Sequence, residues 1–476
     1  METTRRPSWR QTEKQYFLED PSKLCFIEEN PDISGSPLWP SDSSFDAERI
    51  TTNLNAAQET LKKIGGFVFA RHLVLNGERE LDSENLCWQE NPSKLSTTFV
   101  SGFLLPRSRI SASRIGFYPK EGEIPSLKES VKNLKGTWLA SNLGYFITSK
   151  LIRQLNSRHP KEEHLQESDN SYLGGYFVRQ KDGMIAYPPH FGTCGVGITK
   201  NGEPVLVNDV RLGGGTIEIG DQKFKWSEVD VNPKSADGKQ LVVYTPSHNL
   251  ETIGKNRINV VVVNEGQGTY PAPKIAYIKD GELRQPAGAV VFSFPSSRRK
   301  SGSSRDWIPA SAGMTVKFEF EPWFDEKLWN SLDCFYEGLM ELSLDGHHNF
   351  KDWLHPNAVL TQETFIPNPL RREPRNILIE TEKYFGSFAF SGRYEHSLGI
   401  SFDEIIPALK NILNQLAPKQ NLKKVFSLDG GSGAKLCLVK NGEVGALNWV
   451  APGMRNRLGD PNGNTYSCLL LNIGDQ

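Results

Sequence analysis

The sequence predicts an α+β fold, in which a mixed, largely antiparallel sheet forms the core and helices flank it. Two observations lead to this prediction. Short apolar runs rich in β-branched residues recur through the middle of the chain, and Gly, Asn and Pro turns separate them, which is typical of strands joined by hairpins. Helical patterns are interspersed irregularly among these runs, whereas an α/β fold would alternate strand and helix regularly.

The N-terminal part of the chain is predicted to be an irregular extension that ends in one helix. Residues 1–45 are rich in Pro, Ser, Asp and Glu. Within residues 50–64, apolar residues recur at spacings of three and four, and two glycines then end the helix. We therefore expect an extension with one helix over residues 1–64 and a single domain over residues 65–476.

Two further helices carry capping signals at their N-termini. Ser126 and Glu129 fit a capping box ahead of a short helix that ends at a glycine. In "SFDEIIPALKNILNQLAP" the apolar residues share one helical face, and Ser401 and Glu404 fit a second capping box. Because Pro407 lies deeper than the first turn normally allows, a later start of this helix stays open.

The predicted strands are short and their turns are recognisable. Apolar, β-branched runs are "LVVYTP" at 241–246, "INVVVV" at 258–263 and "AVVFSF" at 289–294. The Asp-Gly pair of "IKDGEL" (278–283) and the Asn-Gly pair of "VKNGEV" (439–444) stand between strand-like flanks, so we expect a hairpin at each.

Composition and charge narrow the class of protein. A chain of 476 residues with 37% hydrophobic and 23% charged residues is typical of a soluble globular protein with one large domain or two ordinary ones. The net charge of −1 gives no general indication of a nucleic-acid or anionic membrane partner, and we expect neither. The sequence predicts no oligomeric state.

The cellular compartment is predicted from three absences in the sequence. There is no signal-peptide pattern, no apolar stretch of about 18 residues that would span a membrane, and no Cys-x-x-Cys pair. The six cysteines are scattered, which favours a reduced interior, with three disulfides as the alternative. We therefore expect a cytoplasmic protein.

The segment "KVFSLDGGSGAKLCLV" at 424–439 places three glycines and a serine between two apolar runs. A nucleotide-binding P-loop is excluded, because Lys435 follows an alanine and enters a strand. Ser432 and Lys435 match a Ser-x-x-Lys nucleophile motif, but that motif needs both residues on one helical face, and "AKLCLV" has the pattern of a strand.

A third interpretation rests on a family resemblance. "FSLDGGSGAKLCLV" followed by "MRNRLGDPNGNTYSCLLL" resembles the C-terminal signature of the phosphodiester glycosidase family, whose animal member is N-acetylglucosamine-1-phosphodiester alpha-N-acetylglucosaminidase. In that signature a strand ends in Leu-Asp-Gly-Gly, and an arginine precedes the closing strand. These positions are 428–431 here, with Arg455 or Arg457 as the arginine.

The resemblance continues upstream in the order of the family and covers about residues 100–476. Asn142 in "LASNLGYF" stands at the family's asparagine position, and "LGGYF" at 173–177 is a rival without the Asn. Further matching segments are "GVGITKNGEPV", "LVVYTP", "PRNILIE" and "FSGRYEHSLGISFDEI". The resemblance implies a phosphodiester glycosidase-like domain.

The resemblance also implies an activity and its residues. The reaction would hydrolyse a sugar C1–O–phosphate bond, without a cofactor or metal, on a sugar-1-phosphate-containing molecule or glycan. Because a phosphate monoester leaves well, the site chiefly needs arginines to bind it. The implied catalytic residues are Asp429, Arg375 and Arg393, and the implied substrate-binding residues are Asn142, Gly430, Gly431, Ser432 and Arg457.

Other interpretations of these residues stay open. Asp429 would also suit an Asx-type turn, a sugar-hydroxyl anchor or a metal ligand, and the capping box accounts for Glu404. The chain departs from the family at Asn376 (Thr in the family), at Ser391 (Asp in the family) and in the order Ser432-Gly433. These departures point to an alternative, a catalytically inactive descendant that binds sugar phosphates. Three histidines, His347, His348 and His355, lack standard metal-ligand spacing.

The segment 296–315, "SSRRKSGSSRDWIPASAGMT", is predicted to be an exposed inserted loop, because it is rich in Ser and Arg between two strands. Its end resembles peptide translated from dispersed repeats of bacterial genomes. Replacing it with a short Gly/Ser linker should leave the thermal unfolding temperature nearly unchanged, since surface insertions add little loop-closure entropy. A fall of many degrees in calorimetry would show instead that the segment packs into the core.

Overall fold

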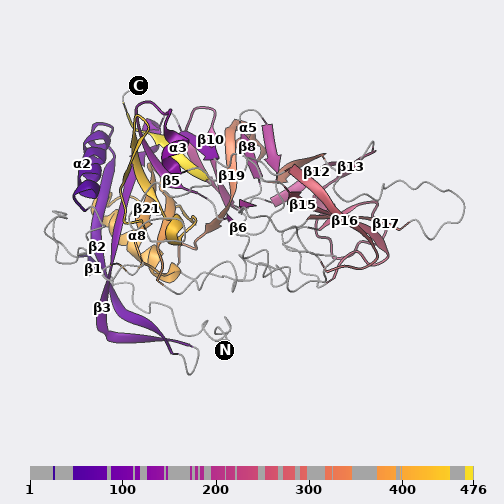
Figure 1. Cartoon of the computed structure of the whole chain (residues 1–476), viewed down its shortest axis with the longest axis horizontal. Helices are drawn as coiled ribbons and strands as arrows, with labels where there is room; N and C mark the ends of the chain where they lie inside the picture. The colour runs from indigo at the N-terminus through magenta and orange to yellow at the C-terminus, as the bar shows by residue number, and fades with distance from the viewer. Residues whose placement is uncertain are drawn as a thin grey trace, which may run out of the picture.

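The computed structural model gives the chain an elongated shape built mainly from antiparallel sheets (Figure 1). It describes residues 25–26, 47–82, 87–110, 113–117, 126–143, 146–147, 172–173, 177–180, 183–186, 194–208, 211–219, 222–244, 252–265, 272–284, 290–296, 317–323, 325–345, 372–392, 397, 399–450 and 467–474. Every strand pairing within the named sheets of these residues is antiparallel, as the hairpin pattern predicts; helices are few.

The largest sheet has eleven strands. Its order is β1 (Cys25–Phe26), β2 (Phe67–Asp82), β3 (Cys87–Pro106), β21 (Tyr384–Phe390), β20 (Arg375–Glu380), β22 (Lys424–Ser427), β19 (Leu332–Glu341), β10 (Cys194–Thr199) and β11 (Pro204–Val207), with β8 (Phe177–Gln180) beside β19 and β9 (Gly183–Ala186) beside β8. Four strands from the second half of the chain therefore form the centre of the sheet, and strands from the first half flank them on both sides.

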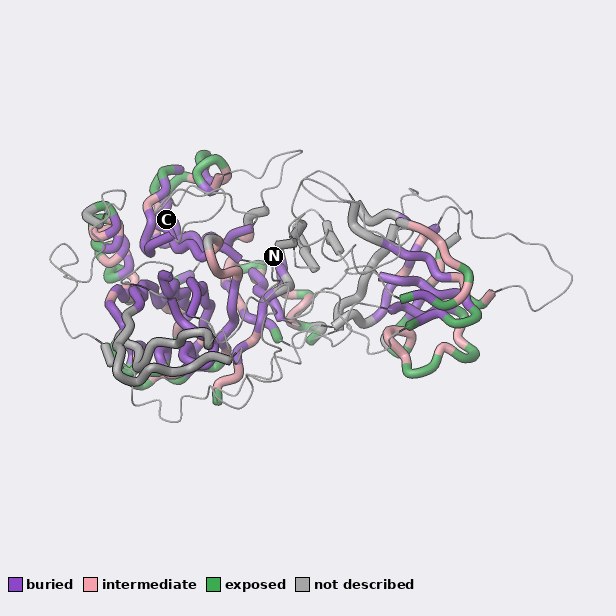
Figure 2. The backbone as a smooth tube through the Cα atoms, turned by 60° about the horizontal axis from the view of Figure 1, so that its bottom comes forward, coloured by how far each residue is buried: buried purple, intermediate pink, exposed green. Residues whose placement is uncertain are grey.

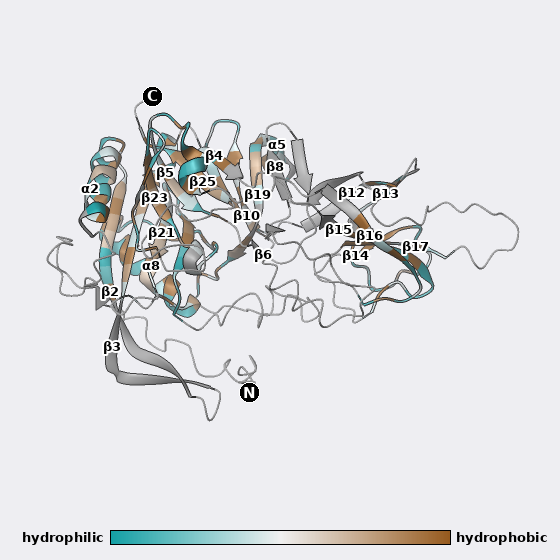
Figure 3. Ribbon diagram, in the orientation of Figure 1, coloured by the Kyte–Doolittle hydropathy of each residue, from teal (hydrophilic) through white to brown (hydrophobic). Residues whose placement is uncertain are grey.

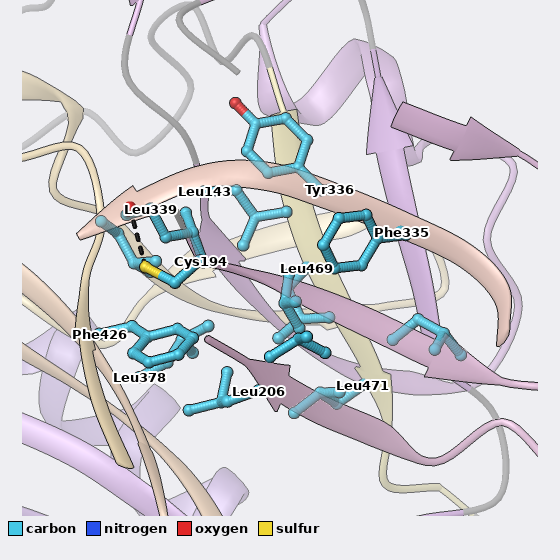
Figure 4. Packing of buried hydrophobic residues seen from close by; sticks show 14 of the residues in the cluster. Leu143, Cys194, Leu206, Phe335, Tyr336, Leu339, Leu378, Phe426, Leu469 and Leu471 are labelled. Atoms are coloured by element: carbon cyan, nitrogen blue, oxygen red, sulfur yellow. Dashed lines mark hydrogen bonds between the residues drawn. The ribbon is translucent and has the colours of Figure 1, made fainter. Parts of the chain in front are cut away.

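A five-stranded sheet packs on the centre of the large sheet. Its order is β24 (Glu443–Ala446), β23 (Leu436–Lys440), β5 (Thr137–Asn142), β25 (Ser467–Asn472) and β4 (Ser113–Phe117). Apolar side chains of both sheets form one core between them. Figure 4 shows Leu378 and Phe426 of the large sheet in the same cluster as Leu469 and Leu471 of β25. Each such side chain contributes about 1.5–3 kcal/mol on burial.

The smaller sheets lie at the end of the molecule away from α2 (Figures 1 and 2). They are a four-stranded sheet of β14 (Val242–Tyr244), β17 (Val290–Pro295), β15 (Arg257–Glu265) and β16 (Ala272–Asp280), and a three-stranded sheet of β13 (Gln222–Trp226), β12 (Arg211–Ile219) and β18 (Lys317–Trp323). Strands β6 (Phe146–Ile147) and β7 (Tyr172–Leu173) form a separate pair.

The helices confirm the capping and periodicity signals. They are α2 (Ala47–Lys63), α3 (Leu127–Val131), α5 (Glu326–Ser331) and α8 (Phe402–Leu416), with 3₁₀ turns η3 (Arg107–Arg109), η5 (Glu228–Asp230) and η7 (Gly431–Gly433). The Ser126 hydroxyl accepts the Glu129 amide at 3.1 Å. Helix α8 begins at Phe402 despite Pro407, so the later start is wrong, and the Glu404 carboxylate accepts the Ser401 amide at 3.0 Å.

Helix α8 covers the second face of the large sheet, so the centre of the molecule has three layers. Ile377 and Ile379 of β20 face the apolar stripe of α8, whereas Leu378 between them faces the five-stranded sheet. Strand side chains alternate between faces, and β20 is buried on both sides along nearly its whole length, with apolar residues at 377–379 and polar residues at its two ends. Figure 3 shows apolar residues concentrated around β21, β23 and β25.

Of the two predicted hairpins, one is confirmed. Strands β23 and β24 are joined by Asn441 and Gly442, whose φ angles of +49° and +83° fit a type I′ turn. The hairpin at Gly281 is wrong. This glycine ends β16 with a φ of +92°, but Leu283 then bridges to Ile253, and the next strand pairs with β15 on its other side.

Where the structure describes the side chain of a cysteine, it is a free thiol: Cys194, Cys334, Cys437 and Cys468. Burial raises the pKa of the Cys437 thiol to about 12 and that of Cys334 to about 11, so both are protonated at neutral pH. Within the described residues, no helix combines the length and apolar character that crossing a membrane requires.

Candidate functional site

The glycine turn lies where the large sheet and the five-stranded sheet meet. Strand β22 ends at Ser427 in the first sheet, and β23 begins at Leu436 in the second. The chain between them crosses from one layer to the other through the 3₁₀ turn η7, and Gly431 has a φ of +58° there. A glycine adopts this left-handed conformation without steric cost.

Buried charges concentrate around this turn. In the described part of the chain, the buried Asp, Glu, Lys and Arg residues are Arg257, Arg372, Glu373, Arg375, Asp403, Glu404 and Lys435. All except Arg257 lie in the segments 372–375 and 401–404 or at the start of β23. Charged residues are rarely buried unless they are paired or functional, so this cluster marks the candidate site.

Arg375 and Asp429 each lie close to a glycine of the turn. A Cβ atom built on Gly430 would lie 2.7 Å from the Pro374 carbonyl oxygen and 3.8 Å from Nη1 of Arg375. A Cβ atom on Gly433 would lie 2.1 Å from Oδ2 of Asp429. The two glycines therefore allow the guanidinium and the carboxylate to approach the backbone of the turn closely.

The Arg375 side chain is buried and held in one orientation. Its Cζ atom lies 4.1 Å from the centre of the Phe402 ring, and Nε donates to the Ile400 carbonyl oxygen at 3.4 Å. Only 4% of the residue is exposed. A guanidinium stacked on an aromatic ring keeps its charge and its in-plane donors.

Asn142, at the end of β5, holds both ends of the turn. Its Nδ2 donates to the Asp429 carbonyl oxygen at 3.0 Å, and its Oδ1 accepts the Lys435 amide at 2.9 Å and Nδ2 of Asn376 at 2.6 Å. Both lone pairs of the amide oxygen are thus used. The structure assigns Asn142 a positioning contact with Asp429, and its predicted substrate contact stays a prediction.

Two of the three departures from the family pattern, Asn376 and Ser391, make internal hydrogen bonds. Asn376 is fully buried, donates also to the Ser141 hydroxyl at 3.0 Å and accepts from Ser387 at 3.3 Å. The Ser391 hydroxyl, also fully buried, accepts the Trp449 amide at 3.0 Å. Neither residue weakens the packing between the layers.

Two of the four backbone amides of residues 430–433 donate to carbonyl oxygens of the protein. The Gly431 amide donates to the Pro374 carbonyl oxygen at 2.9 Å, and the Gly433 amide donates to that of Gly430 at 3.0 Å. The amides of Gly431 and Gly433 are therefore not available to bind a phosphate in this conformation. The amides of Gly430 and Ser432 stay candidates.

The serine-nucleophile alternative lacks the geometry that it requires. The 3₁₀ turn ends at Gly433, and Lys435 follows it directly before β23, so Ser432 and Lys435 do not share a helix. Lys435 is 1% exposed.

Several predicted residues lie outside the described residues: Arg393, Arg455, Arg457, the three histidines and nearly all of the loop 296–315. Gly392, directly before Arg393, packs against Pro374, where an added Cβ would lie 2.8 Å from the Pro374 nitrogen. Within the described ranges, no group of three or more His, Cys, Asp or Glu residues could hold a metal ion.

The residues that hold Arg375 in place were not predicted from the sequence. The Arg375 guanidinium stacks on the Phe402 ring, and Glu404, two residues after Phe402, forms a buried ion pair with Arg372. The capping box was the only local signal, because it fixes where α8 begins and hence where Phe402 lies. Nothing in the run of basic residues around 372 distinguishes a buried arginine from a surface one.

No family model and no curated protein matches the chain. Two solved structures are similar over much of it, each at 12% identity. A hypothetical protein from Synechocystis has a TM-score of 0.40, with 84% of this chain and 62% of that chain covered. A chain from Burkholderia pseudomallei K96243 named "Putative exported protein" has a TM-score of 0.42, with 79% and 74% covered. At these scores the likeness carries no functional argument.

The asparagine pair generates a stability prediction. Asn376→Ala should lower the free energy of unfolding by about 1–3 kcal/mol, because it removes a buried amide and leaves Asn142 and Ser387 short of a partner. Urea denaturation measures the change. Asn208→Ala is the control, since this exposed asparagine bonds only to Glu341 at the surface, and its effect should stay within about 0.5 kcal/mol. Equal effects of the two substitutions would contradict the role given to Asn376.

Proposed function

We propose that the chain hydrolyses glycosyl-1-phosphodiesters, breaking the sugar C1–O–phosphate bond and releasing free sugar and a phosphomonoester. The observation that carries the proposal is that Arg375 and Asp429 both lie against glycines of one turn. The ordered motifs of the phosphodiester glycosidase family support it, because both residues stand at motif positions. On this proposal, residues 65–476 form a phosphodiester glycosidase-like domain.

The chemistry divides between a cation and a carboxylate. As the C1–O bond breaks, its electron pair passes to the phosphate oxygen, and the Arg375 guanidinium neutralises the charge that develops there. Water attacks C1, and its proton passes to the Asp429 carboxylate, which also faces the positive charge at the anomeric carbon. A good leaving group makes a strong general acid unnecessary.

The remaining predicted residues take supporting roles in this proposal. Arg393 and Arg457 would add positive charge for the phosphate, with Arg455 as the alternative to Arg457. Gly430 keeps the turn free of a side chain between Arg375 and the substrate, since a Cβ there has no room. Gly430 and Ser432 would contact the sugar or phosphate through their backbone amides, whereas Gly431, whose amide donates to Pro374, would shape the turn.

A second candidate function is binding of sugar phosphates without turnover. It is favoured by Ser391, a neutral and fully buried residue that bonds to the backbone, where the family pattern has an aspartate. Loss of one carboxylate at this position would leave a site that still recognises a phosphate through arginines.

One experiment separates these functions. The purified protein is incubated with a panel of glycosyl phosphodiesters, including an N-acetylglucosamine-1-phosphodiester, and free sugar and phosphomonoester are measured. Asp429→Asn should lower kcat by orders of magnitude, because it keeps the size of the side chain and removes the charge, with unfolding free energy changed by no more than about 1 kcal/mol.

Ser432→Ala is the matched control on the same turn, and its effect on kcat should be mild. The opposite order, with Ser432→Ala inactive, would restore the serine nucleophile. Binding without turnover across the panel would favour the second function. If Asp429→Asn unfolds the protein with no separable effect on activity, Asp429 is a turn residue and the central assignment is wrong.

A further inference from the structure

Two segments that are distant in sequence are fastened together beside the glycine turn. Glu373 and Ile400 form an antiparallel bridge, in which the Ile400 amide donates to the Glu373 carbonyl oxygen at 3.0 Å and the Glu373 amide donates back at 3.3 Å. This bridge aligns the residues before β20 with the residues before α8. Arg375 follows it on one side and Phe402 on the other.

A buried ion pair closes the same junction. Nη2 of Arg372 lies 2.6 Å from Oε1 of Glu404, and Nε lies 3.1 and 3.2 Å from the two carboxylate oxygens. The two side chains are 5% and 2% exposed. Removing the two charges from water costs free energy that offsets much of their attraction, so the pair adds little to stability. Its effect on the orientation of neighbouring residues is therefore the more informative property.

Glu404 connects this ion pair to the start of α8. Its Oε2 accepts the Ser401 amide at 3.0 Å and the Ser401 hydroxyl at 2.7 Å. Phe402 lies between Ser401 and Glu404 and is the first residue of the helix. One carboxylate thus fixes the position of Phe402 through Ser401 and, through Arg372, the segment that leads to Arg375.

Arg375 is the residue on which these contacts converge. Its Cζ stacks 4.1 Å above the Phe402 ring, and its Nε donates to the Ile400 carbonyl oxygen. Both partners belong to the segment that Glu404 and the bridge hold in place. A shift of that segment would change the direction in which the guanidinium faces the turn.

We propose that Arg372 and Glu404 are positioning residues, which set the orientation of the Arg375 guanidinium at the glycine turn through Phe402 and Ile400. The consequence for phosphate binding rests on the proposed function, whereas the orientation itself does not. A merely structural ion pair would affect stability and leave Arg375 where it is.

The test uses the double variant Arg372→Met/Glu404→Gln in the full-length protein. It removes both charges together, so neither is left buried without its partner. Gln at the third helical position still accepts the Ser401 amide, as in a capping box, so α8 keeps its start. We expect a folded protein with nearly unchanged circular dichroism.

The readout is the ¹⁵N–¹H resonance of the Arg375 Nε–Hε group, assigned by its loss in Arg375→Lys. The Phe402 ring shifts this proton in the wild type, because the guanidinium stacks on the ring. In the double variant the ring-current shift should be reduced or lost. An unchanged resonance in a folded double variant overturns the proposal.

Glu380→Gln is the matched control. Glu380 lies at the other end of the same strand and pairs with Arg107 at 2.7 Å, so the substitution also disturbs an Arg–Glu pair. The Arg375 resonance should not move in this variant. If it moves as far as in the double variant, the effect is general loosening of the sheet and the proposal is wrong.

Activity provides a second, separate readout. If the wild type hydrolyses a glycosyl phosphodiester, kcat/KM of the double variant should fall roughly tenfold to a hundredfold, as expected for a misdirected binding group. A wild type without turnover counts against the proposed function, and the resonance still decides the orientation. A displaced resonance with unchanged kcat/KM overturns the role in the site.

A single variant covers the case in which the double variant does not fold. Arg372→Lys keeps the positive charge beside Glu404 but replaces a planar fork of donors with one ammonium group. The same resonance should shift by a smaller amount, and an unshifted resonance in this variant again overturns the proposal.

Discussion

The side-chain amide of Asn142 is the contact on which the geometry of the candidate site depends. It stands at the end of β5 in one sheet and bonds to Asn376 of β20 in the other, and it holds the backbone on both sides of the glycine turn. Most of the contact between the two stacked sheets is made by apolar side chains, which resist separation but do not fix one lateral position. The buried amides supply that direction.

The local features of the fold could be predicted from the sequence because their causes are local. The apolar spacing of α2, the cap at Ser126 and the Asn-Gly turn before β24 each act within a few residues. The turn at Gly281 has the same local signal but is not a hairpin, because strand pairing is decided by β15, which lies between its neighbours β16 and β17. Pairing with a strand that is distant in sequence cannot be recognised from a few consecutive residues.

The candidate site was predictable in part for the same reason. Asp429 and Arg375 stand in recognisable motifs, and the structure brings both to one turn. The ion pair of Arg372 and Glu404 joins residues 32 positions apart. Neither the residue types nor their spacing in the sequence predicts that they pair. The sequence shows which groups can react, whereas the groups that orient them become visible only once the layers are packed.

The order of the five-stranded sheet bears on how the chain acquires its shape. Strand β5 lies between β23 and β25, and among the described strands β4 pairs with β25, so the partners of these two early strands follow more than 290 residues later in the chain. During synthesis β4 and β5 lack these partners until β23 and β25 have left the ribosome. Such long-range closure is slow and leaves apolar edges exposed to other chains in the meantime. The layer that carries Asn142, and with it the ordered turn, can therefore form only after β23 and β25 have been synthesised.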